Sequence, residues 1–134
     1  MTALTVARDT QRRENLQLSL PMSASKIYEG AIVCLSAAGY ATKGAVATTL
    51  RAAGVAEATV DNSAGNAGDV SIDVKRGTFK FGNSASTDQI TLADYGKDCY
   101  IVDDQTVAKT DGTGTRSVAG KIRGVDTDGV WVEF

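Results

Sequence analysis

The sequence predicts a mainly β fold, a small barrel or sandwich of short antiparallel strands, with one short helical turn and an extended N-terminal arm. Apolar residues alternate with polar ones over several short stretches, which is the period of a strand with one buried face. Clusters of Gly, Asn, Asp and Ser separate these stretches and are typical of tight turns. With 134 residues, the chain fits one domain that buries a core without disulfides.

Residues 1–22 are predicted to form an arm in front of a single β-rich domain, residues 23–134. Residues 1–15 are polar and charged without an apolar period, which indicates a flexible arm rather than a signal peptide. Three leucines then alternate with polar residues: Leu16, Leu18 and Leu20. Pro21 ends this pattern because proline cannot donate to a sheet ladder. The pattern is either the first strand of the domain or a strand that adds to a neighbouring protein.

The middle of the chain predicts strands over residues 26–35 and about 49–59, although residues 45–53 also fit a helical stripe. The run 31–35 is apolar on both faces, so both faces are expected to be buried, or one of them to form a subunit contact. Residues 61–69 form a cluster of turn-forming residues.

Two alternating stretches then differ in parity. Val70, Ile72 and Val74 occupy even positions, and Phe79 and Phe81 occupy odd ones. One extra residue between them reverses the face on which the apolar side chains lie. We therefore expect a β-bulge or a sharp bend at Gly77.

The last third predicts one helical turn at Thr91–Gly96, with Thr as N-cap and Gly as stop, and then two β-hairpins. The final tight turn is expected at Asp126–Gly129, with Gly129 in a positive-φ conformation. After it, Val130, Val132 and Phe134 face one way, and Trp131 and Glu133 face the other. Trp131 is expected in the core or at a subunit interface, with a ligand platform as the alternative.

The composition argues against acid–base and metal chemistry. Without any His, the chain lacks the usual general base and the commonest metal ligand. Asp126–Gly129 resembles the start of a calcium loop but has no carboxylate at the twelfth position. Asp103 and Asp104 are adjacent on an extended chain and are expected to diverge. Residues 111–115 are Gly-rich but lack the lysine and helix of a phosphate loop, which predicts a flexible loop.

Charge and hydropathy restrict the partners. The net charge of −2, without a dense Lys/Arg cluster, argues against nucleic-acid binding. No apolar run approaches the roughly 20 residues that a membrane helix needs. Cys34 and Cys99 are far apart in apolar segments, so we expect them to be buried and free, as in a reducing cytosol.

Two segments resemble a known family in the order and spacing of their turns and strands. One runs from Val55 through Val60-Asp61-Asn62-Ser63-Ala64-Gly65 to Asp69. The other begins Gly96-Lys97-Asp98-Cys99-Tyr100-Ile101-Val102-Asp103-Asp104-Gln105-Thr106-Val107 and continues to Val132. Together they are similar to the head decoration, or capsid cement, proteins that tailed phages and prophages encode beside the major capsid protein. The similarity covers roughly Ser25 to the end, and the arm falls outside it.

The resemblance implies a structural virion protein rather than an enzyme, without a cofactor, a nucleic acid or a membrane as partner. Such a protein is made in the bacterial cytoplasm, is often a homotrimer, and sits on the outer surface of the expanded capsid, where it cements neighbouring capsid subunits. The candidates for capsid contact by strand addition are Leu16, Leu18 and Leu20. Trp131, or its strand, is the candidate for the trimer contact.

Three other functional classes are compatible with a small β-rich protein to different degrees. A phage tail or head–tail connector protein is also small and β-rich, and a ring of six or a tube would favour it. A ligand-binding β-module needs exposed aromatics, but one Trp, four Tyr and three Phe offer little for a platform. An enzyme comes last because general-base candidates are missing.

Overall fold

The computed structural model describes residues 2–134, which fold into two five-stranded antiparallel sheets and a two-stranded ribbon. The first sheet has the order β1-β7-β5-β3-β4. Its strands are β1 (Gln17–Pro21), β3 (Ile32–Leu35), β4 (Ala41–Lys43), β5 (Arg51–Ala56) and β7 (Ser71–Lys75). The ribbon pairs β2 (Lys26–Ile27) with β6 (Val60–Asp61). The mainly β class is confirmed.

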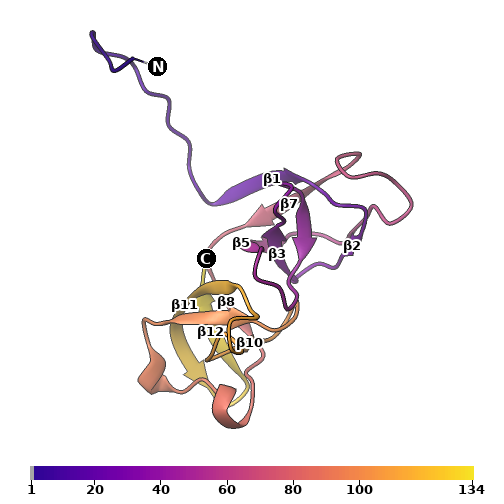
Figure 1. Cartoon of the computed structure of the whole chain (residues 1–134), viewed down its shortest axis with the longest axis vertical. Helices are drawn as coiled ribbons and strands as arrows, with labels where there is room; N and C mark the ends of the chain where they lie inside the picture. The colour runs from indigo at the N-terminus through magenta and orange to yellow at the C-terminus, as the bar shows by residue number, and fades with distance from the viewer. Residues whose placement is uncertain (1) are drawn as a thin grey trace.

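The second sheet has the order β10-β9-β11-β12-β8. Its strands are β8 (Thr78–Phe81), β9 (Asp98–Ile101), β10 (Val107–Ala108), β11 (Val118–Asp126) and β12 (Gly129–Glu133). Two 3₁₀ turns, η1 (Ser86–Asp88) and η2 (Leu92–Asp94), connect β8 to β9. The two sheets form two lobes along the long axis of the molecule (Figure 1).

Each sheet curls until its outer strands meet. In the first, Met22, just after β1, bridges to Ala41 of β4. In the second, Gly82, just after β8, bridges to Thr106 beside β10, and the Val107 N–H donates to the Gly82 carbonyl at 3.0 Å. Each closure is a single bridge, which ties the two outer strands of the sheet together at one point. We call the two units the first barrel and the second barrel.

The protein has two apolar cores, and the core of the second barrel is shared between the two barrels. The first encloses one apolar cluster, which includes Val33, Ile72 and Val74. The interior of the second is filled by its own strands together with three residues from the outer wall of the first barrel: Ile32, Cys34 and Val55. Neighbouring residues of β3 therefore enter different cores. The expectation that both faces of residues 31–35 are buried is confirmed, within one chain.

The bend expected at Gly77 is where the chain changes sheets. β7 ends in the first barrel at Lys75, and β8 begins in the second at Thr78. Gly77 has a φ of +149°, which a side chain would strain, and its carbonyl accepts the Phe134 N–H at 2.9 Å. The apolar parity reverses there because the two strands face different cores, not because one strand bulges.

The arm is shorter than expected. β1 pairs with β7 over its whole length, with Leu18 opposite Val74 and Leu20 opposite Ile72. Both leucines are half-buried against the first core. The domain therefore begins at residue 17 rather than 23, and the arm within the described residues is 2–16. Of the two interpretations of this segment, the ordinary first strand is correct.

Local structure corrects three further expectations. Residues 26–35 form two strands, β2 and β3, because a turn at Gly30 (φ +86°) separates them. Gly129 does not have a positive φ; a side chain there would instead meet the Lys80 Cγ at 2.6 Å and the Phe81 carbonyl oxygen at 2.7 Å. The expected helical turn forms at η2, but η1 is a second one.

The η2 turn carries the expected cap. The Thr91 N–H donates to the Asp94 carboxylate at 3.0 Å, which holds the pKa of that carboxyl below its ordinary value, with Lys109 and Lys97 adding to the effect. Because Asp94 is buried, this charge-assisted cap fixes the turn against β11.

Candidate interaction surfaces

The acidic motifs of the sequence form turns. Asp103 accepts the Gln105 N–H at 2.9 Å, as a residue that shapes its own turn does. Asp126 and Gly129 are paired at the β11–β12 hairpin, so the hairpin interpretation is confirmed. No group of three or more His, Cys, Asp or Glu side chains within residues 2–134 is arranged to hold a metal ion.

The residues on both sides of the Gly-rich loop, 111–115, contact η1. Arg116 forms an ion pair with Asp88 at 3.2 Å, and the Thr110 hydroxyl donates to the same carboxylate. The Lys109 N–H donates to the Asp88 carbonyl at 2.9 Å. These contacts hold both ends of the loop beside η1, and the flexibility expected within the loop stays a prediction.

Both cysteines are buried and unbridged, as expected. Burial raises the pKa of the Cys34 thiol to about 12 and that of Cys99 to about 11. Because the thiolate is the reactive form, neither side chain is a nucleophile near neutral pH. Both act as apolar core residues.

The N-terminal arm, residues 2–16, is exposed throughout and extends away from the first barrel (Figure 1). It contains three exposed apolar side chains, Leu4, Val6 and Leu16, and three arginines. The Leu16 carbonyl accepts the Arg76 N–H at 2.9 Å, so the arm is anchored where β1 begins. Of the three leucines proposed to contact a partner, only Leu16 is largely exposed, at 67%, because Leu18 and Leu20 pack in the first barrel.

A second surface lies on the outside of the second barrel, around Trp131. We call it the tryptophan face, and it comprises Lys80, Tyr95, Arg123, Trp131 and Glu133. The Trp131 ring is 39% exposed, which excludes the core position considered from the sequence. Its indole N–H donates to Asp126 at 3.2 Å, and the Lys80 Nζ lies 5.5 Å from the ring centroid.

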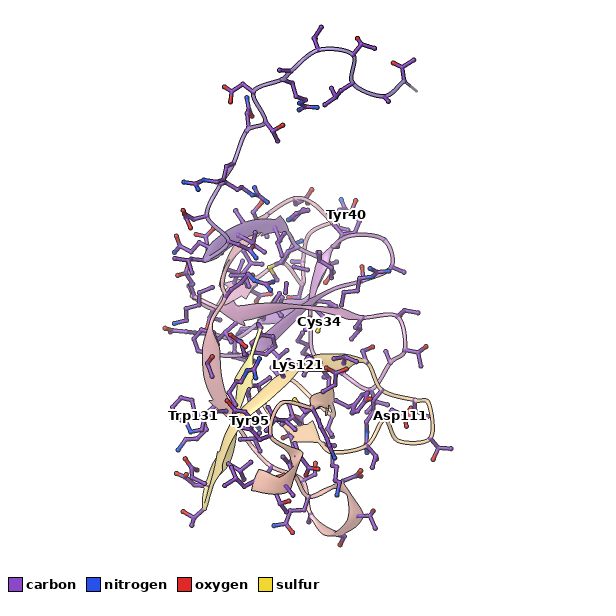
Figure 2. The ribbon with its side chains drawn as sticks, turned by 90° about the vertical axis from the view of Figure 1, so that its left-hand side faces the viewer. Cys34, Tyr40, Tyr95, Asp111, Lys121 and Trp131 are labelled. Carbon is purple, nitrogen blue, oxygen red and sulfur yellow. The ribbon has the colours of Figure 1, made fainter. Side chains whose placement is uncertain are left out.

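The cations of the tryptophan face are neutralised within the chain. Arg123 lies 5.8 Å from the centroid of the exposed Tyr95 ring and forms an ion pair with Glu133 at 2.8 Å. Lys80 contacts Asp128 at 2.9 Å. Hydrogen bonding with Asp128, and also with Trp131, lowers the pKa of Asp126 to about 2. The result is a surface whose two cations are both paired with carboxylates and which presents two aromatic rings on the same side (Figure 2).

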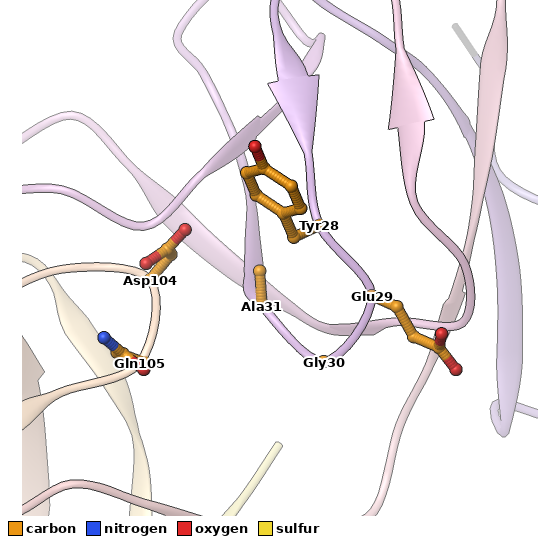
Figure 3. A pocket seen from close by; sticks show the side chains of 6 residues that line it. All are labelled: Tyr28, Glu29, Gly30, Ala31, Asp104 and Gln105. Atoms are coloured by element: carbon orange, nitrogen blue, oxygen red, sulfur yellow. The ribbon is translucent and has the colours of Figure 1, made fainter.

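A third feature is a cleft of about 420 Å³ at the seam between the barrels. One wall is the β2–β3 turn, residues 28–31, and the other is Asp104 and Gln105 at the β9–β10 turn. The Ile32 N–H donates to the Asp104 carbonyl at 2.8 Å and joins the walls. Asp104 and Tyr28 face each other across Ala31, whereas Glu29 points outward (Figure 3). We call it the seam cleft.

The sequence did not indicate the seam cleft. Its walls are separated by more than seventy positions and meet only because the β3 wall of the first barrel covers the second. Neither Tyr28-Glu29 nor Asp104-Gln105 is a motif by itself. The acidic Asp103-Asp104 pair was visible as a turn, but nothing local indicated what that turn would face.

Within residues 2–134, no helix is long and apolar enough to cross a membrane. Compared with protein-family models, with curated proteins and with solved structures, the chain matches none of them.

Proposed function

We propose that the protein is a structural component of a tailed-phage head. It binds the outer surface of the expanded capsid, as a trimer, and holds neighbouring subunits of the major capsid protein together. The exposed arm carries this proposal. It is anchored to the body at one end and extends away from it, so its apolar side chains are free to contact a second protein. The resemblance of residues 55–69 and 96–132 to capsid cement proteins supports it.

The capsid contact is assigned to the arm rather than to β1. The backbone of β1 is already paired with β7 on one side, and Leu18 and Leu20 contribute to the first core. Leu4, Val6 and Leu16 are exposed and are available to a groove or a sheet edge of the capsid. Three arms on one trimer bind with avidity, because the first contact raises the effective concentration of the others.

Deleting residues 2–15 tests the proposal. We expect apparent affinity for expanded capsids that lack the protein to fall on the order of 100-fold, because the avidity of the arms is lost. The deletion keeps Leu16, whose carbonyl binds Arg76, so the thermal unfolding midpoint should stay unchanged. Co-sedimentation measures the binding, and circular dichroism measures the midpoint.

A full-length triple variant, Leu4→Ser, Val6→Ser and Leu16→Ser, is the matched control for arm length and charge. It should lose binding to a similar extent if the apolar contacts dominate. Unexpanded shells should bind neither the intact protein nor the variants. Undiminished binding by the deletion variant would refute the arm as the contact, and an intact protein that binds no shell would favour a tail or connector role.

Trp131→Ala tests the trimer contact. The tryptophan face combines an exposed Trp with Arg and Tyr, the residue types enriched at the centres of interfaces. We expect the variant to be monomeric by sedimentation and to lose less stability than the roughly 3–5 kcal/mol typical of a buried tryptophan, because Trp131 is partly exposed on the surface. Val118→Ala, a half-exposed position on β11, is the control. A Trp131→Ala protein that remains trimeric would remove this face from the assembly.

A further inference from the structure

The seam cleft has the chemistry of a receptor for a basic side chain. A carboxylate and a phenol face each other across it, and the Gln105 amide adds an acceptor. The Lys26 Nζ lies 4.8 Å from the Tyr28 ring centroid, so an ammonium already covers part of this ring within the chain. Tyr28 is 57% exposed, so the part of its ring that Lys26 does not cover is accessible. Backbone hydrogen bonds fix the Tyr28 wall, where the Ala31 N–H donates to the Tyr28 carbonyl at 3.1 Å and the Gly30 N–H to the Ala56 carbonyl at 3.0 Å.

This set of groups fits a guanidinium better than an ammonium. A guanidinium is planar, stacks on an aromatic ring, and donates two parallel hydrogen bonds to one carboxylate. Asp104 supplies the carboxylate and Tyr28 the ring, on opposite sides of a space of about 420 Å³, which has room for one long side chain. The expected occupant is therefore an arginine on an extended segment.

The arm of the same sequence contains such arginines. Arg8, Arg12 and Arg13 outnumber Asp9 and Glu14, which gives the arm a charge of +1 and leaves −3 for residues 17–134. Among the described residues, none of the three arginines forms an ion pair or a hydrogen bond. They are exposed, on a segment that contacts its own body only at its end.

We propose that the seam cleft of one copy binds an arginine from the N-terminal arm of a second copy, either Arg12 or Arg13. The arm extends away from its own body, and its residues span up to roughly 50 Å when fully extended, which is enough to reach an adjacent molecule. The charges of the arm and the cleft are complementary. The proposal does not depend on the capsid, although copies held side by side on a shell bring arm and cleft together.

A disulfide-trapping experiment with full-length protein tests the proposal. One copy carries Gln11→Cys beside the arginines, and the other carries Gln105→Cys on the cleft wall. The native thiols are buried and do not compete. Isotope labelling of one copy lets mass spectrometry separate mixed pairs from like pairs. Thr127→Cys, at the exposed β11–β12 turn, replaces Gln105→Cys in the control.

We expect the mixed disulfide to form on the order of tenfold faster at the cleft than at the control position, because binding raises the local concentration. Adding Arg12→Ala and Arg13→Ala to the arm, or Asp104→Asn to the cleft, should reduce the rate to that of the control. Equal rates at the two positions would overturn the proposal. A chain with both engineered thiols that closes mainly on itself would assign the cleft to its own arm and overturn the exchange between copies.

The outcome is independent of the shell-binding experiment, which contains no engineered thiol. Copies that bind capsids but show no preference for the cleft would refute the exchange and leave the proposed function intact. Copies that form the disulfide at the cleft but bind no capsid would support the exchange between copies and refute the proposed function.

Discussion

Ile32→Ala is expected to lower the free energy of unfolding by about 2–5 kcal/mol, the usual cost of truncating a fully buried isoleucine. Ile32 lies on a strand of the first barrel, but its side chain is part of the core of the second. The cavity should therefore weaken the contact between the barrels as well as the packing of the second. Urea denaturation measures the change.

Two probes make this prediction specific. Trp131, the only tryptophan, reports the second barrel by fluorescence, whereas far-ultraviolet circular dichroism reports both barrels. We expect the two transitions to coincide in the wild-type protein and in Ile32→Ala, because one shared core makes unfolding cooperative. Val33→Ala, the next residue on β3, probes the first core alone. Transitions that separate already in the wild type would contradict a shared core.

Gly54→Ala is the second substitution with a large expected effect, about 3 kcal/mol or more. Gly54 has a φ of +153°, and a Cβ there would contact the Lys75 carbonyl oxygen and lie 2.8 Å from the Val74 Cγ1. Backbone strain and overpacking therefore add at this position, where β5 pairs with β7. Thermal unfolding of the purified variant measures the loss.

Gly39→Ala is the matched control for Gly54→Ala. Gly39 also has a positive φ, +85°, but a Cβ there would meet nothing within 4 Å. It should cost only about 1 kcal/mol, the conformational preference of glycine without the clash. Equal losses at the two positions would show that backbone conformation alone explains the effect of Gly54→Ala.

The two-residue alternation predicted much of the β structure. The Val70–Val74 pattern and the alternation after Gly129 correspond to β7 and β12, and the parity change located the bend at Gly77. These signals are local, because the side-chain period of a strand is independent of the strand's partner. The cap of η2 was predictable for the same reason, since its two partners are three residues apart.

Long-range pairing was not predictable from these patterns. The sequence does not encode locally that β8 joins a different sheet from β7, or that Met22 and Thr106 take part in closing two barrels. Whether Leu18 and Leu20 belong to the domain or to a free arm depends on their pairing with β7, more than fifty positions away. The preferences of tight turns predicted a positive φ at Gly129. The structure instead explains the glycine by the close approach of Lys80 and Phe81 from another strand, which leaves no room for a Cβ.

The shared core also has a consequence for synthesis. The strands of the first barrel all precede residue 76, and those of the second all follow it. As the chain leaves the ribosome, the first barrel is complete while Ile32, Cys34 and Val55 still lack their cover. The nascent protein therefore exposes an apolar patch until its last strand emerges, and premature release of the chain would favour aggregation through that patch.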